Sequence, residues 1–329
     1  MIASTLRRYA VSACIGALSV ICAATVHAEP AWPAKPVTLV VPFPPGGDLD
    51  TVGRLLADGL AKRTGQSFVV ENRAGAGGTI GAAYVAHAAA DGYTLLLGSS
   101  GDQVNAAYLY AKLPYSPEND LSPISIVARG HLVLLASPAA PYADVAGLLG
   151  YAKAHPGEVT YASSGTGTAS HLAGELLQQV AGLDMVHVPF KGNAPALSAV
   201  LGGHVQLIFA SPVTASQHLR QRTLEPIAAT TTQRSETRDG VMPFADAGLQ
   251  IDVPTLYVLT APKGVPAPIV EKLSREVSEL VGSSDFAERL RALGASPQGD
   301  TPDEARQFLD RERTRWQAVI TKAGITADQ

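Results

Sequence analysis

From residue 36 onward, short runs of apolar and β-branched residues alternate with longer amphipathic stretches. The first cycle shows the pattern. Val37–Val41 is an uninterrupted apolar run typical of a buried strand, and Val52, Leu55 and Leu56 then recur on one face of a helix. Such alternation is typical of parallel sheets flanked by helices, so we expect an α/β protein.

The cycles divide into three groups along the chain. In the first group we expect strands at 37–41, 67–70 and 93–97 and helices at 50–64 and 79–88. The second group holds an apolar run at 124–137, strands at 159–162, 185–188 and 205–209, and helices at 143–154, 170–180 and 194–201. The last group holds a strand at 256–260 and helices at 268–281, 285–293 and 301–322.

A chain of 329 residues usually forms more than one domain. If the last helices pack back on the first group, the chain crosses between two lobes near Val127–His131 and again near Asp252–Leu256. We therefore expect residues 29–128 and 253–329 to form lobe 1, and residues 129–252 to form lobe 2. Two crossings make a hinge, and hinged lobes commonly close around a ligand.

Residues 1–28 have the sequence pattern of a secretory signal peptide. Arg7 and Arg8 precede the uncharged apolar stretch Val11–Val26, and small residues lead to an expected cleavage after Ala28. The alternatives are an uncleaved membrane anchor and lipid attachment at Cys22. The apolar stretch is short for a membrane span, and the residues before Cys22 are poor for lipoprotein processing. We expect export to the periplasm without an anchor.

The composition of the mature chain excludes several classes of function. Both cysteines, Cys14 and Cys22, lie in the signal peptide, so thiol catalysis and cysteine-bound metals are excluded. Removal of Arg7 and Arg8 leaves 23 Lys and Arg against 29 Asp and Glu, and no strongly basic stretch remains to bind nucleic acid. No later apolar run reaches membrane-spanning length, which predicts a soluble protein.

The strongest local motif is the glycine-rich segment 42–50, between a strand and a helix start. Glycines there let the backbone approach a ligand, and the free N–H groups of the helix start favour an anion. This predicts a carboxylate cradle, in which Asp50 caps the helix. Asp48 places a negative charge beside the cradle, which opposes a bare anion unless the ligand carries an amine or the side chain turns to solvent.

Three further loops join a strand to a helix start. Segment 161–171 is dense in glycines and hydroxyl groups, and segment 98–105 contains Ser99. Segment 188–196 contains Lys191, which is either a counter-charge for the ligand or a solvated lysine. In open α/β sheets, ligands bind outside the carboxyl ends of the strands. We therefore expect these loops to converge on one cleft.

Other chemistry finds little support in the sequence. Segment 72–79 has the spacing Gly-x-Gly-Gly and lacks the acidic residue of a dinucleotide site. The seven mature histidines form no metal-binding motif, and we expect neither metal nor cofactor. A hydrolase using Ser170 or Ser164 with His171 remains an alternative, although no Gly-x-Ser-x-Gly motif surrounds either serine. His171 is either a ligand contact or a hydrogen-bonded histidine at a lobe surface.

Several motifs follow one another over nearly the whole mature chain: Trp32-Pro33 through Val41–Gly47, Val70–Arg73, Asp91–Leu96, Tyr161–Gly165, His171–Glu175, His187–Gly192 and a final helix with Trp316. In this order they resemble the substrate-binding receptors of tripartite tricarboxylate transporters, also called the Bug family. The resemblance implies a periplasmic-binding-protein-like fold of type II-like architecture, with two α/β lobes around a hinge and a ligand cleft between them.

The resemblance also implies a function and its residues. Such receptors bind carboxylates through backbone amides and bridging waters, and deliver them to a membrane permease of a large and a small subunit. The matching positions are Phe43, Pro45, Gly46, Gly47, Ser164, Gly165, Thr166 and Thr168. We expect a monomeric, non-enzymatic receptor for a small carboxylate. A receptor that signals to a sensor protein is the alternative.

Two departures from the family pattern concern the ligand. Asp48 stands where a small neutral residue usually follows the two glycines, and Phe209-Ala210-Ser211 replaces the usual Phe-Asp. Together with Ser99, His171 and Lys191 from the loops above, Asp48 and Ser211 complete the expected ligand contacts.

Overall fold

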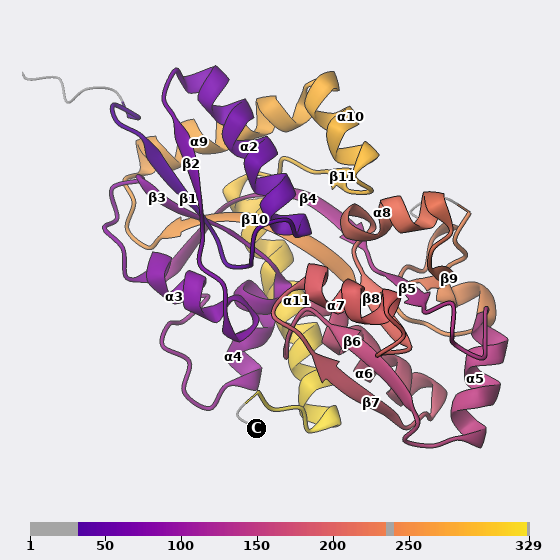
Figure 1. Cartoon of the computed structure of the whole chain (residues 1–329). Coiled ribbons are helices and arrows are strands. Elements are labelled where there is room, and N and C mark those ends of the chain that lie inside the picture. Colours follow the sequence, from indigo (N-terminus) through magenta and orange to yellow (C-terminus); the bar gives the residue numbers. More distant parts are fainter. Residues whose placement is uncertain (1–31, 235–239, 328–329) are drawn as a thin grey trace, which may run out of the picture. The chain divides into compact units, whose positions relative to one another are not determined.

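The computed structural model describes residues 32–234 and 240–327. The expected signal peptide lies outside these residues. The strands form one sheet of six strands and one of five (Figure 1). We call the part built on the six-stranded sheet the first lobe and the part built on the five-stranded sheet the second lobe.

The six-stranded sheet combines strands from both ends of the chain. Its order is β11 (Ser296–Pro297), β4 (Leu121–His131), β10 (Pro254–Pro262), β3 (Thr94–Gly98), β1 (Val37–Val41) and β2 (Phe68–Asn72). β1 is parallel to β2 and β3, whereas β10 is antiparallel to β3 and β4. The carboxyl ends of β1 and β3 therefore lie at the same edge.

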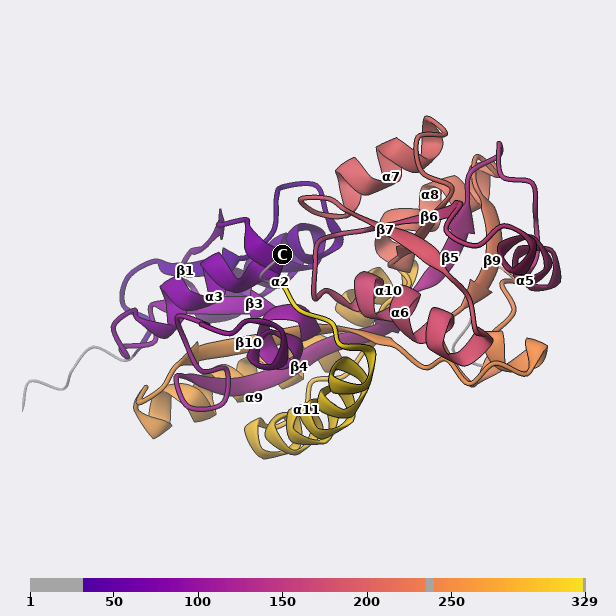
Figure 2. The same ribbon diagram turned by 90° about the horizontal axis from the view of Figure 1, so that it is seen from below.

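The five-stranded sheet has the order β7 (Met185–Pro189), β6 (Val159–Ser163), β8 (Leu207–Ala210), β5 (Val133–Ala136) and β9 (Glu225–Ala229). β6 is parallel to β7 and β8, and β5 is antiparallel to β8 and β9. Both sheets are thus mixed, whereas the sequence pattern predicted parallel sheets. In the six-stranded sheet the reason lies in the crossings, because β4 leaves the first lobe, β10 returns to it, and the two strands pair antiparallel (Figure 2).

Helices cover both sheets of the described chain. In the first lobe these are α2 (Asp48–Thr64), α3 (Thr79–Ala86), α4 (Ala106–Leu109), α9 (Ala267–Gly282), α10 (Ser284–Ala292) and α11 (Pro302–Ala323). Of the last three, α9 and α11 contact β4, and α10 contacts β11. The second lobe has α5 (Val145–Ala154), α6 (Ala169–Ala181), α7 (Asn193–Leu201) and α8 (Pro212–Gln221).

Local sequence explains the ends of the two longest helices. α2 has two acidic residues in its first turn, where the helix dipole favours negative charge, and it ends at Gly65 in the left-handed conformation with φ of 72°. α11 begins with a capping box, in which Thr301 and Glu304 satisfy each other's backbone N–H groups. Trp316 of α11 is 2% exposed and lies in the hydrophobic core. None of the helices within the described residues is long and apolar enough to span a membrane.

Candidate functional site

The loop between β1 and α2 is fixed by one carboxylate. Asp50 accepts hydrogen bonds from the Gly46 N–H, the Arg54 Nε–H and the Asn72 amide, each at 3.0 Å. Gly46 has φ of 84°, a conformation that glycine adopts without strain. The prediction that Asp50 caps the helix is wrong, because α2 begins two residues earlier at Asp48 and Gly47 is its N-cap. Asp50 instead shapes the loop that precedes the helix.

Asp48 points into the protein and not to solvent. Its carboxylate accepts hydrogen bonds from the Asn193 amide at 3.1 Å, the Tyr257 hydroxyl at 3.3 Å and the Ser211 hydroxyl. Burial raises the pKa of Asp48, and the bonds from the Leu49 N–H, Ser211 and Asn193 oppose that rise. Asn193 and Ser211 belong to the second lobe, so this carboxylate links the two lobes.

The loop between β6 and α6 gathers three hydroxyl groups. The Ser170 Oγ lies 3.1 Å from the Ser164 Oγ and 3.0 Å from the Thr168 Oγ1, and it accepts the Ser164 N–H at 3.0 Å. Gly165 and Gly167 turn the chain with φ of 136° and 81°. Thr168 is the N-cap of α6, whose first turn carries the N–H groups and positive dipole end that favour an anion.

The loop after β3 presents a hydroxyl whose proton is already engaged. The Ser99 Oγ donates to the Asp102 carboxylate at 2.7 Å and accepts the Gly101 N–H at 3.2 Å. Asp102 is fully buried, and this burial raises its pKa to about 6 although Ser99 and Gln103 donate to it. While Asp102 is ionised, Ser99 therefore offers a ligand an acceptor and not a donor.

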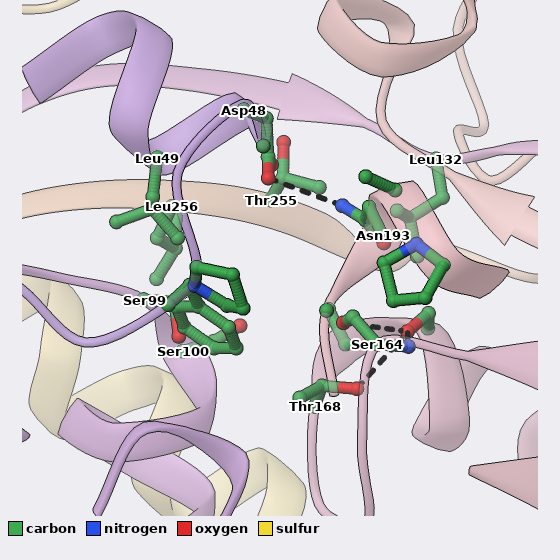
Figure 3. A pocket seen from close by; sticks show the side chains of 18 of the residues that line it. Asp48, Leu49, Ser99, Ser100, Leu132, Ser164, Thr168, Asn193, Thr255 and Leu256 are labelled. Atoms are coloured by element: carbon green, nitrogen blue, oxygen red, sulfur yellow. Dashed lines mark hydrogen bonds between the residues drawn. The ribbon is translucent and has the colours of Figure 1, made fainter. Parts of the chain in front are cut away.

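One pocket brings the four loops together between the lobes (Figure 3). We call it the main pocket. It is lined by Phe43, Pro44, Pro45, Gly47, Asp48, Leu49, Ser99, Ser100, Leu132, Ser164, Thr168, Ala169, Ser170, Gly192, Asn193, Ala194, Pro195, Thr255 and Leu256. Its cavity volume of about 50 Å³ corresponds to a few water molecules, and a ligand enters it when the lobes move apart.

A second pocket adjoins the main pocket and shares Phe43, Pro44 and Ser164 with it. We call it the side pocket. Its other lining residues are Gly75, Ala76, Gly77, Gly78, Tyr110, Gly165, Thr166, Pro189, Phe190, Lys191 and Ala327. A ligand longer than the main pocket can extend past Ser164 toward Lys191.

The predicted contacts fall into four groups. Seven line the main pocket: Phe43, Pro45, Gly47, Asp48, Ser99, Ser164 and Thr168. Gly165, Thr166 and Lys191 line the side pocket. Gly46 and Ser211 do not line either pocket, and they bond to Asp50 and Asp48 respectively. His171 lies in a third pocket, with Glu175 and His187.

His171 is a buried packing residue. Its Nδ1 accepts the Gly167 N–H at 3.1 Å, and its ring stacks on His187 with 3.9 Å between centroids. Burial lowers the pKa of His171 to about 3 and that of His187 to about 4. Ser163 is hydrogen-bonded to the His187 Nε2 at 2.6 Å, but Ser163 has no exposed surface. Ser170 of the main pocket precedes His171 in the chain, but its hydroxyl bonds to Ser164 and Thr168, whereas the His171 Nδ1 bonds to Gly167.

Sequence reasoning missed part of the pocket wall. Asn193, Thr255, Leu132 and Leu256 were not expected as contacts. The last three lie on or beside the crossing strands, whose pairing shifts register twice, so alternation along the sequence does not reveal which side chains face the cleft. Asn193 was within a predicted loop, and its position as the first residue of α7 was the available signal.

No group of three or more potential metal ligands occurs in the part of the chain that the structure describes. The described lining of the main pocket is instead made of short hydroxyl side chains, helix starts, apolar residues and one carboxylate. This arrangement suits a small polar organic molecule.

The sequence model of the tripartite tricarboxylate transporter family receptor matches residues 52–325. The chain belongs to this family. An R. palustris protein solved with adipate is 35% identical, with a TM-score of 0.87 over 90% of this chain and 99% of that one. MatC from Rhodopseudomonas palustris, solved with malate, is 36% identical, with a TM-score of 0.83 over 88% and 100%.

The periplasmic binding protein BugD is 32% identical to this receptor, with a TM-score of 0.85 over 90% of this chain and 99% of that one. The expected family and the expected two-lobed, type II-like fold are therefore confirmed. Solved proteins similar to this receptor include a periplasmic binding protein and proteins that hold dicarboxylates.

Proposed function

We propose that this receptor captures a small carboxylate in the periplasm and delivers it to a tripartite tricarboxylate-type permease. The observation that carries the proposal is the convergence of three helix starts, those of α2, α6 and α7, on the main pocket. Helix starts supply N–H donors and a positive potential, which hold a carboxylate without an arginine or lysine in the pocket. Similar proteins solved with adipate and malate support this ligand class.

The lobes and the site follow from the same proposal. We assign residues 29–128 and 253–329 to lobe 1 and residues 129–252 to lobe 2, with the hinge at β4 and β10. The carboxylate lies against Ser164, Thr168 and the start of α6, with Phe43, Pro45 and Gly47 on the opposite wall. Export depends on the segment 1–28, and the receptor acts as a monomer.

The non-enzymatic reading is favoured by the hydroxyl groups in the main pocket. Ser164 and Ser170 bond to each other and to the loop backbone, and the imidazole of His171 is held by Gly167 in another pocket. A serine nucleophile needs a base within hydrogen-bonding reach. The hydrolase alternative predicts turnover of an ester panel that His171→Ala abolishes, whereas we expect no turnover by the unmodified receptor.

Ligand binding is tested by thermal unfolding of the mature receptor with di- and tricarboxylates, amino acids and aromatic acids. A ligand at a hundred times its Kd stabilises the folded state by about 2.7 kcal/mol, so a true ligand raises Tm by several degrees. Ser170→Ala removes the acceptor that holds the Ser164 N–H and weakens binding about tenfold, an effect of the size expected for one hydrogen bond. Ser198→Ala, on the exposed face of α7, is the matched control.

A panel in which no acid raises Tm contradicts the receptor function. If the Ser170→Ala and Ser198→Ala variants bind the ligand equally strongly, the placement of the carboxylate at the start of α6 is contradicted. Transport is distinguished from signalling by uptake: deletion of the permease abolishes accumulation of the identified ligand if the receptor feeds a transporter.

A further inference from the structure

One end of the main pocket offers hydrogen-bond acceptors. The Asn193 Nδ2 donates to the Asp48 Oδ1 at 3.1 Å, which turns the amide oxygen of Asn193 away from that bond. This Oδ1 is buried and has no hydrogen-bond partner among the described residues. A buried acceptor without a donor is unfavourable, so a ligand group that donates at this end is stabilised.

The same end carries one formal charge, that of Asp48, which outweighs the partial positive charges at the starts of α2 and α7. Asp48 is the single ionisable side chain among the described residues that line the main pocket. Its hydrogen bonds come from the neutral groups of Asn193, Tyr257 and Ser211, so no cation in the lining compensates it. A second carboxylate placed beside Asp48 is repelled in an environment of low dielectric, whereas an ammonium group is attracted.

The opposite end of the pocket has the complementary chemistry. Figure 3 shows Asp48 and Asn193 at one end of the cavity and Ser164 and Thr168 at the other. The second end has the hydroxyl groups and the start of α6, and it opens toward the exposed Lys191 of the side pocket. The pocket is therefore polarised from an acceptor end to an anion-binding end.

We propose that Asp48 and Asn193 form an ammonium-binding subsite, so that the receptor selects a zwitterionic amino acid over a dicarboxylate. This selectivity rests on the proposed function, because it requires the carboxylate to lie at the Ser164 end. Asp48 is then the residue that determines specificity, and it also keeps its bonds to the second lobe when the lobes close.

Matched pairs of ligands isolate the contribution of the ammonium group. The probes are 3-aminopropanoate with succinate, 4-aminobutanoate with glutarate, and 5-aminopentanoate with adipate, since the members of each pair share the number of methylene groups. Isothermal calorimetry on the mature receptor gives both affinities. For the pair whose length fits, we expect the amino acid to bind at least about tenfold more tightly than the dicarboxylate.

Asp48→Asn removes the charge and leaves an acceptor for Asn193, Ser211 and Tyr257. We expect this variant to bind the amino acid more weakly and the dicarboxylate more tightly. The ratio of the two affinities then falls to about one or reverses. Asp58→Asn is the matched control, because Asp58 is an exposed carboxylate on the same helix that pairs with Lys62, and its loss leaves the ratio unchanged.

The possible outcomes separate the inference from the proposed function. Equal or tighter binding of the dicarboxylate to the unmodified receptor overturns the ammonium subsite and leaves the receptor function intact. If Asp48→Asn weakens the binding of the amino acid and of the matched dicarboxylate equally, the ammonium subsite is also overturned, because Asp48 then only links the lobes. If none of the six probes and no α-amino acid binds while other acids do, the ammonium subsite is rejected and the receptor function is kept. Failure of every acid rejects both.

Discussion

The stacked pair His171 and His187 makes the second lobe sensitive to acid. Both imidazoles are neutral in the folded receptor, because burial holds their pKa values at about 3 and about 4. In the unfolded chain a histidine binds a proton below its ordinary pKa of about 6.5. Between about pH 6.5 and about pH 4, the unfolded state therefore binds more protons than the folded state. The free energy of unfolding falls as the pH falls through this range.

Replacement of one imidazole tests this residue-scale argument. Between pH 8 and pH 5, the titration of His171 alone lowers the free energy of unfolding by roughly 2 kcal/mol. His171→Gln removes this loss, so the fall in stability over the same range shrinks by about that amount. Urea denaturation at both pH values measures it. An unchanged pH dependence would show that His171 is not buried as a neutral base.

His155→Gln is the control for this substitution. His155 is the half-exposed C-cap residue of α5, where its ring stacks on Tyr151 and lies near Glu158. The variant is expected to keep the acid sensitivity of the unmodified receptor, because His155 takes no part in the buried pair of His171 and His187.

The residue types of the site could be predicted from the sequence better than the orientations of their side chains. Glycines and hydroxyl groups after strands identified the loops, and seven of the thirteen predicted contacts line the main pocket. The direction in which the His171 side chain points could not be foreseen, because it follows from a hydrogen bond with the Gly167 N–H and from stacking on His187 of β7. Such partners are distant in sequence or depend on the exact turn of a loop.

At the scale of single elements, apolar periodicity predicted most helices and strands. The apolar run at 124–137 was expected as one unit, but the structure divides it into β4 and β5 on either side of Leu132, in two different sheets. α8 was missed because its sequence is mostly polar, and β9 because it is short and includes Pro226. Periodicity reports burial, and it contains no information on which sheet a strand joins.

The packing of α6 on β6 depends on a glycine. A Cβ atom at Gly174 would lie 2.2 Å from the Tyr161 ring, so Gly174→Ala forces the helix away from the strand. We expect it to lower the free energy of unfolding by about 1 to 3 kcal/mol, the usual cost of overpacking. Because α6 begins at the hydroxyl-rich loop, ligand affinity should fall as well.

Gly150→Ala on α5 separates packing from helix propensity. A Cβ atom there meets no atom within 4 Å, and alanine favours a helix more than glycine does, so this variant should be neutral or slightly stabilising. Denaturation curves of the two variants provide the comparison. Equal stability of both would contradict the close approach of α6 to Tyr161.

At the scale of the whole receptor, the first lobe closely approaches the loop between β6 and α6 of the second lobe. The Asn105 amide of the first lobe donates to the Gly167 carbonyl of the second at 2.9 Å. Beside it, a Cβ atom at Gly77 would lie 2.6 Å from the Thr166 carbonyl oxygen. Glycine at position 77 therefore permits this approach, and a side chain there would hold the lobes apart.

Gly77→Ala tests whether ligand capture requires this approach. The substitution also places alanine at a φ of 63°, which costs roughly 1 kcal/mol in the folded state whether or not ligand is bound. Gly65→Ala imposes the same strain at φ of 72°, with no atom within 4 Å of its Cβ. Both variants should therefore lose similar stability without ligand, but only Gly77→Ala should bind the identified ligand about tenfold more weakly, with faster dissociation. Equal affinity of the two variants in calorimetry would mean that the liganded lobes stay further apart than in this structure, and that the contacts between Asp48 and Asn193 are not kept in the complex.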